Sequence, residues 1–306
     1  MSALVAIVGP TASGKSELAM RIALELDAEI VSADSRQVYR GMDIGTAKPS
    51  APDRETVPHH LLDLVDPNET YDVSRYQRDA DAVLAELDRR ARVGLLVGGT
   101  GLYVRAIVDG LALAELPHDA VLRTKLEAEA ARDGTDALHA RLAARDPDAA
   151  ARVHPRNVRR VIRYLEVTEL AGPISARWSR RVSRHASLVG LRVPLDELDR
   201  RIGARVRGMV ERGVIAETRV LIERYGELSR TARTAHGYPH WIAHLEGRLS
   251  LDEAFARTVK DTRAYARRQL TWFRRDARVR WLDATTAGDA IRGALGVSRS
   301  IAAEGG

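Results

Sequence analysis

Residues 9–16 read Gly-Pro-Thr-Ala-Ser-Gly-Lys-Ser and fit the pattern G-x-x-x-x-G-K-[ST] at every fixed position. Gly9 and Gly14 let the backbone turn so that its N–H groups point inward. Lys15 adds a full positive charge, and the Ser16 hydroxyl is an oxygen ligand that suits magnesium. These residue types at this spacing predict a phosphate-binding loop (P-loop).

The segments on either side supply the context that this loop needs. Residues 4–8, Leu-Val-Ala-Ile-Val, predict a buried strand. From 17 to 26, apolar residues recur at helical spacing, so a helix N-terminus with its partial positive charge would face the anion. A chance glycine-rich turn, the alternative, does not account for a strand before the loop and a helix after it.

A second polar segment follows a strand predicted at 28–32. Residues 33–49 have no clean period and predict a loop at the carboxyl end of that strand, where ligands bind in open α/β sheets. Asp34 allows two interpretations: a helix N-cap, or a general base or magnesium ligand near the cradle. The adjacent His59 and His60, on a strand predicted at 59–67, would point to opposite faces, which favours hydrogen-bonded histidines over a metal site.

A third loop follows the strand predicted at 93–97. It reads Gly98-Gly99-Thr100-Gly101 and leads into a helix, so it could close on an anion from the other side. P-loop nucleotidases usually place an aspartate at the end of a core strand to organise magnesium and water. Its replacement here by Gly-Gly-Thr counts against NTP hydrolysis.

Between Pro117 and Ser187 the pattern becomes helical, with periodic segments at 118–133, 135–145 and 155–170. The sequence therefore predicts an α/β fold, a P-loop NTPase-like parallel sheet core with a helical insertion domain. We expect the first part of the core at 1–116, the insertion at 117–187, and the second part of the core, with basic helices, at 188–306.

Charge is segregated along the chain. Residues 1–154 carry 18 Lys/Arg and 25 Asp/Glu, a net of 18 − 25 = −7, whereas residues 155–306 carry 30 and 17, a net of 30 − 17 = +13. A basic C-terminal half suggests a polyanionic partner. The chain has no cysteine, which excludes disulfides, thiolate zinc sites and thiol nucleophiles. Without an apolar run near 20 residues or a signal-like N-terminus, we expect a cytoplasmic protein that does not enter the membrane.

The basic residues gather in three segments. Residues 156–163 are the most charged part of the insertion, either a solvated helix face or a set of phosphate contacts. Arg201 and Arg205 lie four apart on one helix face and could be surface charge or reach a phosphate site. Residues 260–275 predict one long basic helix in which Tyr265, Trp272 and Phe273 could stack on unpaired bases or belong to the core.

Several long runs resemble the bacterial tRNA dimethylallyltransferases, also called tRNA isopentenylpyrophosphate transferases. They are GPTASGKS at 9–16, SADSRQVYRGMDIGTAKP at 32–49, HHLLDLVDP at 59–67, VGGTGLYVRA at 97–106, NVRRVIRYLEV at 157–167 and TRAYARRQLTWFRR at 262–275. They span nearly the whole chain in the family's order.

The resemblance implies transfer of a dimethylallyl group from dimethylallyl diphosphate to N6 of the adenosine 3′ to the anticodon (position 37), in tRNAs that read codons beginning with U. The product would be N6-isopentenyladenosine, and the P-loop would hold the donor's diphosphate with Mg²⁺ instead of an NTP. The family flips the target base into a channel through the protein. A monomer is expected.

The resemblance also implies residue roles. The catalytic residues would be Asp34 as general base, with Thr100 and Arg205 contacting the diphosphate. The remaining donor contacts would be Gly9, Thr11, Ala12, Ser13, Gly14, Lys15, Ser16 and Gly99, with Ser16 also holding the metal. The tRNA contacts, besides Asp34, would be Ser35, Arg36, Gln37, Arg123, Arg159, Arg160, Arg163, Arg267 and Arg268.

Two positions depart from the family's pattern. His236 stands where an apolar residue is common and Pro239 where a basic one is, which weakens the implied tRNA contacts of that loop. Three other functions stay open from the residues: a P-loop small-molecule kinase or NTPase, an adenylate isopentenyltransferase acting on free AMP, and a non-catalytic RNA-binding protein. The last gives no reason for an intact cradle beside Asp34.

Overall fold

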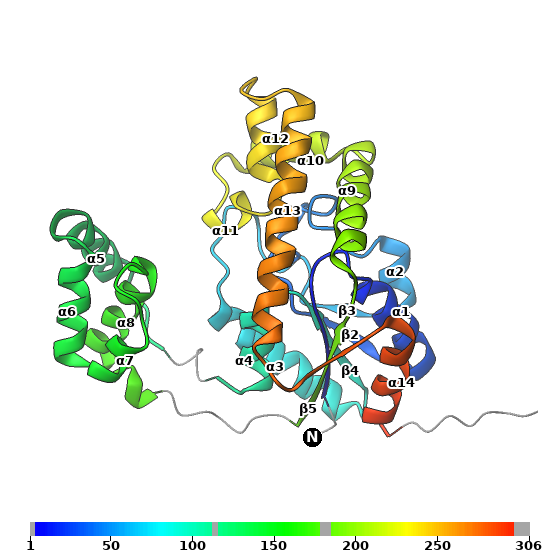
Figure 1. Ribbon diagram of the computed structural model, residues 1–306, viewed down its shortest axis with the longest axis horizontal. Coiled ribbons are helices and arrows are strands. Elements are labelled where there is room, and N and C mark those ends of the chain that lie inside the picture. Colours follow the sequence, from blue (N-terminus) through cyan, green and yellow to red (C-terminus); the bar gives the residue numbers. More distant parts are fainter. Residues whose placement is uncertain (1–3, 112–115, 178–184, 297–306) are drawn as a thin grey trace, which may run out of the picture. The chain divides into compact units, whose positions relative to one another are not determined.

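The computed structural model describes residues 4–111, 116–177 and 185–296 (Figure 1). The chain divides into two compact units: Met1–Val108 with Arg184–Gly306, and Asp109–Ser183. The first unit is an α/β core and the second is helical.

Six strands form one parallel sheet in the first unit. They are β1 (Leu4–Val8), β2 (Glu29–Ser32), β3 (His59–His60), β4 (Gly94–Gly98), β5 (Ala186–Leu191) and β6 (Val279–Leu282). Their order in the sheet is β3-β2-β4-β1-β5-β6, and every neighbouring pair is parallel. The predicted α/β class with a P-loop NTPase-like parallel sheet is confirmed.

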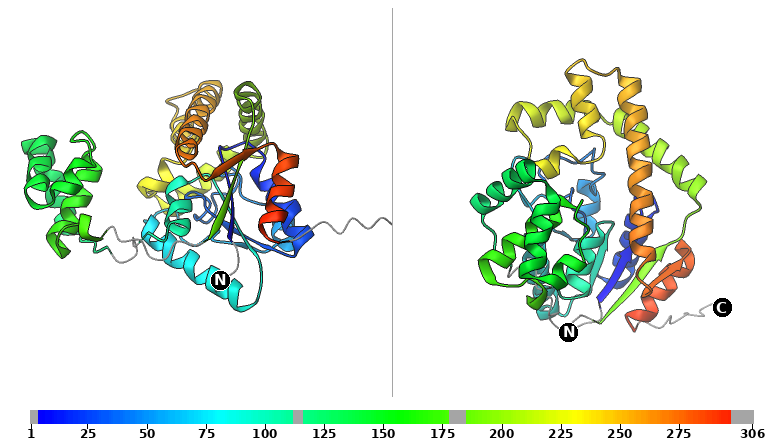
Figure 2. Two further views of the ribbon diagram at one scale, coloured as in Figure 1. Left: turned by 60° about the horizontal axis from the view of Figure 1, so that its bottom comes forward. Right: turned by 60° about the vertical axis from the view of Figure 1, so that its left-hand side comes forward.

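Helices cover both faces of the sheet, which is why β1 is buried along its whole length. Val5 and Ile7 pack with α1 (Lys15–Leu26) and α14 (Ala284–Ala294) on one face. Ala6 and Val8 point the other way, toward α3 (Val73–Arg89) and α4 (Gly101–Val108). The left view in Figure 2 shows α14 and α3 on opposite sides of the strands.

A helical layer stands beyond the carboxyl ends of the strands (Figure 1). It comprises α9 (Leu195–Glu211), α10 (Val214–Tyr225), α11 (Arg230–Arg233), α12 (Tyr238–Leu245) and α13 (Leu251–Arg274). Leu198, Trp241 and Leu270, among others, bury a separate core between these helices. The prediction began the last helix at 260; α13 begins earlier because Ser250 and Glu253 form a reciprocal cap at its N-terminus.

The strand predicted at 59–67 is only two residues long. Leu61 and Asp63 have left-handed backbones, with φ of 66° and 54°, which end the extended conformation. Further along the segment, Val65 forms an isolated parallel β-bridge with Tyr39. The short helix α2 (Ala51–Thr56) precedes this region, and the sequence pattern did not predict it.

The insertion contains α5 (Ala120–Asp133), α6 (Thr135–Arg145), α7 (Pro147–Ala151) and α8 (Val158–Ala171), followed by a short 3₁₀ turn at Ser175–Arg177. Leu126, Leu142 and Leu165 are central to its own hydrophobic core. A unit with its own core of this kind is a compact folding element in its own right.

Candidate active site

Three loops meet where neighbouring parallel strands end. Val8 pairs with Gly98, and Ser32 pairs with Val97, so β1, β4 and β2 finish at the same level of the sheet. The loops that follow them are the P-loop, the Gly98–Gly101 turn and the segment 33–49. The register alone therefore brings together the three segments in which the sequence predicts chemistry.

The P-loop forms an anion cradle at the start of α1. Gly14 precedes the helix with φ of 92°, a left-handed conformation that glycine adopts without strain. The Lys15 ammonium donates to the Pro10 carbonyl at 2.5 Å and so stays folded over the loop. Burial lowers the pKa of Lys15 to about 7, and the positive charge of Arg205 adds to this effect.

Arg205 reaches the cradle from α9. Its Nη1 donates to Thr11 Oγ1 at 3.0 Å, so its guanidinium lies beside the loop that holds Lys15. Arg201, one turn earlier, instead pairs with Glu197. Of the two arginines on one helix face, Arg205 is thus the one that enters the cavity.

Gln269 of α13 connects the P-loop to the second glycine loop. Its Oε1 accepts from the Thr11 N–H at 2.8 Å, and its Nε2 donates to the Gly99 carbonyl at 2.9 Å. A Cβ on Gly99 would lie 2.1 Å from Gln269 Nε2, so only glycine permits this close approach. The amide is buried and holds two cavity walls at a fixed separation.

Asp34 follows β2 and lines the same cavity as the cradle, close enough for its charge to act on Lys15 and Arg205. No helix begins there, so the N-cap interpretation is wrong: Asp34 Oδ1 accepts from the Arg36 N–H at 2.8 Å and closes a turn. Thr100 Oγ1 accepts from the Ser35 N–H at 3.0 Å, which fixes this turn against the second glycine loop. One carboxylate oxygen of Asp34 has a defined partner, and the side chain lines the same cavity as Lys15.

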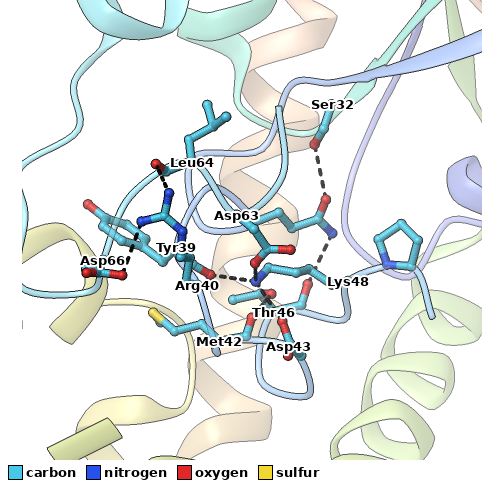
Figure 3. Close-up of polar contacts among 12 residues, drawn as sticks. Ser32, Tyr39, Arg40, Met42, Asp43, Thr46, Lys48, Asp63, Leu64 and Asp66 are labelled. Atoms are coloured by element: carbon cyan, nitrogen blue, oxygen red, sulfur yellow. Dashed lines mark hydrogen bonds and ion pairs between the residues drawn. The ribbon is translucent and has the colours of Figure 1, made fainter. Parts of the chain in front are cut away.

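The segment 33–49 is held in place by a buried lysine and by carboxylates that bond it or the loop backbone. Lys48 donates to the Tyr39 carbonyl at 2.5 Å and to the carboxylates of Asp43 and Asp63 at 2.7 Å and 2.5 Å (Figure 3). From α10, the Glu217 carboxylate accepts from three consecutive backbone N–H groups of the loop, those of residues 43–45. These contacts make a long polar loop rigid enough to position Asp34 and Gln37.

A cavity of about 330 Å³ lies between these loops and the helical layer. The predicted site residues that line it are Thr11, Ala12, Ser13, Gly14, Lys15, Ser16, Asp34, Arg36, Gln37, Gly99 and Arg205. Gly9, Ser35 and Thr100 lie just behind this lining, in the same loops. Ser13 Oγ is buried without a hydrogen-bond partner among the described residues, so it could donate to an anion in the cradle.

The sequence prediction missed part of the cavity wall. Four residues of α13 face the cavity: Thr258, Thr262, Tyr265 and Gln269. Their spacing of four, three and four residues places them on one helix face, a polar stripe that the periodicity of the helix could have revealed. Of these four, the sequence pattern singles out only Tyr265, as a residue that stacks on bases or belongs to the core.

The predicted tRNA contacts in the insertion have different surroundings. Arg123 and Arg163 both bind Glu166, a fully buried carboxylate. Burial alone would raise the pKa of Glu166, but hydrogen bonds from the two guanidinium groups hold it below its usual range. Arg160 donates to Tyr164 Oη at 2.9 Å, whereas Arg159 is exposed and has no ion pair within the described part of the chain.

The two arginines predicted on α13 face different neighbours. Arg267 makes a bidentate ion pair with Asp199 of α9, at 2.8 Å and 3.1 Å. Arg268 lies over the ring of Tyr265, with 5.8 Å between its Cζ and the ring centroid. Arg268 therefore adjoins the cavity wall, and Arg267 does not.

Over the described ranges, no group of three or more His, Asp or Glu residues is arranged to hold a metal ion. His59 bonds to the Val57 carbonyl and His60 to Glu29, so both rings are hydrogen-bonded. Among the helices of residues 4–111, 116–177 and 185–296, none is long and apolar enough to cross a membrane.

Comparison with known families agrees with this geometry. The family model described as IPP transferase matches residues 37–276, and the model described as isopentenyl transferase matches residues 2–63. The chain belongs to the IPP transferase family. The two matched ranges include the P-loop, Asp34, the second glycine loop and α13.

Relatives of this family member cover nearly its full length. A tRNA dimethylallyltransferase of Anaeromyxobacter dehalogenans is 49% identical over 91% of this chain and 94% of its own. The tRNA isopentenylpyrophosphate transferase of Bacillus halodurans, a crystal structure, has a TM-score of 0.72 at 41% identity over 97% of both chains. A eukaryotic dimethylallyltransferase, described as acting on tRNA, superimposes with a TM-score of 0.83 at 25% identity over 99% of this chain and 82% of its own.

Proposed function

We propose that this enzyme transfers the dimethylallyl group of dimethylallyl diphosphate to N6 of the adenosine 3′ to the anticodon (position 37) in tRNAs that read codons beginning with U. The observation that carries the proposal is a single cavity lined both by an anion cradle, with Lys15 and Arg205, and by the Asp34 carboxylate. The names of the relatives supply the substrates, and the cavity supplies a physical reason for them.

The cradle binds and stabilises the leaving group. As the C1–O bond of the donor breaks, negative charge grows on the diphosphate. The loop N–H groups, the α1 N-terminus, Lys15 and Arg205 are already oriented toward that charge, so they stabilise it without reorganising. Ser13 and Thr11 offer hydroxyls to the same oxygens.

Asp34 accepts the proton that the acceptor loses. When N6 forms its bond to C1 of the dimethylallyl group, the nitrogen must lose one proton. The carboxylate of Asp34 lies in the cavity and takes that proton, while its bond to the Arg36 N–H fixes its orientation. One C–O bond breaks, one C–N bond forms, the diphosphate leaves, and no external oxidant or base is required.

The residues present fit a magnesium ion bound with the diphosphate. Mg²⁺ is usually held by one or two protein oxygens together with phosphate oxygens and water, and the cavity offers the Ser16 hydroxyl and the Asp34 carboxylate. Bound there, it would neutralise charge on the departing diphosphate. Ser16 is the residue that we expect to hold it.

The acceptor is an anticodon stem-loop, bound through phosphate contacts and a flipped base. Ser35, Arg36 and Gln37 belong to the Asp34 loop and would lie near that base. Arg159, Arg160, Arg267 and Arg268 would contact RNA phosphates, together with Arg123 and Arg163 where their bonds to Glu166 allow. We also expect a monomer that works in the cytoplasm, where tRNA is modified.

An acceptor assay separates this proposal from its rivals. Purified protein with Mg²⁺ and dimethylallyl diphosphate should prenylate a tRNA stem-loop, detected as N6-isopentenyladenosine by mass spectrometry of the nucleosides, and should leave AMP unmodified. Preferred modification of AMP would favour an adenylate isopentenyltransferase. Strong thermal stabilisation by ATP with none from dimethylallyl diphosphate would favour a kinase.

A further inference from the structure

His236 is a polar ring in the cavity wall that the mechanism above does not use. It lines the cavity together with Ala235, in the short connection between α11 and α12. Most other described histidines have a hydrogen-bond partner, as His240 and His244 do. No hydrogen-bond partner for the His236 ring exists among the described residues, so its nitrogens are available to a ligand.

The ring is held in a defined position by its neighbours. The centroids of His236 and Tyr265 are 3.9 Å apart, with 39° between the ring planes, and Arg268 lies over the Tyr265 ring. Arg36 approaches from the Asp34 loop, and Asp261 supplies a more weakly felt negative charge. His236 thus belongs to a stack of planar groups that forms part of the cavity wall.

The surroundings of the ring also set its charge. Burial lowers the pKa of His236 to about 4, and the charges of Arg36 and Arg268 add to this effect. The imidazole is therefore neutral at physiological pH. A neutral imidazole can donate one hydrogen bond, accept another and stack on a flat ring, whereas it offers little to a diphosphate.

The position of this stack in the cavity indicates which part of the substrate it would contact. Tyr265 is hydrogen-bonded to Thr100 and feels the charge of Asp34, and Arg36 of the Asp34 loop acts on both Tyr265 and His236, so the stack lies near Asp34. If Asp34 takes a proton from N6 of adenine, the purine ring attached to that nitrogen must lie close by. A stack of planar groups beside that position suits a purine.

We propose that His236 binds the acceptor base, packing against the adenine ring and making one hydrogen bond to it. The inference rests on the proposed function and assigns to His236 the recognition of the base, separate from the RNA backbone. His236 would then be a residue that determines acceptor affinity, while Lys15 and Arg205 determine donor affinity.

A cycle of two RNAs and two proteins tests the contact directly. The dissociation constant of the stem-loop with adenosine at the target position is compared with that of an abasic stem-loop, for the wild type and for His236→Val. We expect His236→Val to weaken binding of the adenosine RNA about 5- to 10-fold, the loss of one hydrogen bond. Binding of the abasic RNA should stay unchanged, because the missing partner is the base itself. Equal weakening of both RNAs, or of neither, would overturn the proposal.

Kinetic variants separate recognition from folding. His236→Val should raise the KM for the stem-loop and leave the KM for dimethylallyl diphosphate within about twofold of wild type. His236→Gln, which keeps one hydrogen bond, should recover part of the loss. His244→Gln, on α12 outside the cavity lining, is the matched control and should leave both KM values unchanged. A rise in donor KM as large as that in RNA KM would place His236 at the prenyl group and overturn the inference. An inactive wild type would instead contradict the proposed function.

Discussion

The charge of Lys15 in the P-loop depends on pH in the range near neutrality. In the folded chain its pKa falls to about 7 from the usual 10.5, since burial and Arg205 disfavour the charged form. Between these two values the unfolded chain binds a proton that the folded chain lacks, so stability rises with pH across this window. An anion bound in the cradle would pair with the Lys15 ammonium and raise the pKa of Lys15 again.

Diphosphate binding at pH 8.5 should therefore take up about one proton at Lys15. Isothermal titration calorimetry in two buffers of different ionisation enthalpy measures this uptake. Lys15→Met provides the comparison, because any proton taken up by the diphosphate itself remains in that variant. Equal uptake by Lys15→Met and the wild type would show that Lys15 does not change its charge when the diphosphate binds.

Asp34 has a different kind of role at the same scale. Asp34→Asn keeps an oxygen that can accept from the Arg36 N–H, so the turn should persist while the proton acceptor is lost. We expect turnover to fall about 10²- to 10⁴-fold. The dissociation constant for tRNA should change little. Single-turnover rates and filter binding measure the two quantities, and near-normal turnover would remove Asp34 as the base.

At the level of elements, α13 assembles the site. Gln269 bonds the Thr11 N–H and the Gly99 carbonyl at once, and so ties two loops to one helix. Base stacking and core packing were both possible for Trp272 and Phe273 from the sequence. Phe273 is in the core, whereas Trp272 is 44% exposed.

Gln269→Leu leaves one buried donor and one buried acceptor without partners. We expect a loss of about 1–3 kcal/mol in the free energy of unfolding. The KM for dimethylallyl diphosphate should also rise, because the P-loop loses its fixed distance to Gly99. Urea unfolding and steady-state kinetics give the two readouts. Thr271→Ala, exposed on the same helix, serves as the control. If Gln269→Leu is less stable but keeps a normal KM for dimethylallyl diphosphate, Gln269 supports the fold and does not position the donor site.

The parts of the site that the sequence predicts are those built by local rules. A strand, a glycine turn and a helix follow one another at the P-loop, and their types dictate their geometry. The support of the 33–49 loop is different. Glu217 caps the N–H groups of residues 43–45 from more than 170 positions away, and Lys48 is buried with Asp63. Such contacts depend on tertiary packing, and no local period encodes them.

At the scale of the whole molecule, charge divides between the two halves of the chain. The net charge of −7 for residues 1–154 and +13 for residues 155–306 predicts a polyanion on the second half, but does not say which arginines contact it. The ion pairs of each arginine indicate whether it is available to contact the polyanion. An arginine bonded to a buried carboxylate supports the fold, whereas an exposed one without a partner is available to phosphate.

Two arginines of α8 offer a matched comparison of these roles. Arg159 is exposed and unpaired within the described residues, whereas Arg163 bonds the buried Glu166 at 2.7 Å. Arg159→Ala should leave the insertion stable and reduce the slope of log affinity for tRNA against log salt by about one unit, the effect of one lost phosphate contact. Arg163→Ala should instead destabilise the insertion by about 1–3 kcal/mol, since Glu166 loses one of its two cationic partners.

Salt-dependent tRNA binding and thermal unfolding of both variants measure these effects, with Arg89→Ala, on the exposed end of α3, as the control for an ordinary surface ion pair. Removing either arginine lowers the net charge by one, and the two residues lie about one turn apart on the same helix. A general electrostatic attraction would therefore reduce the slope by the same amount in both. A reduction for Arg159→Ala alone identifies a specific phosphate contact, and an unchanged slope places Arg159 away from the tRNA.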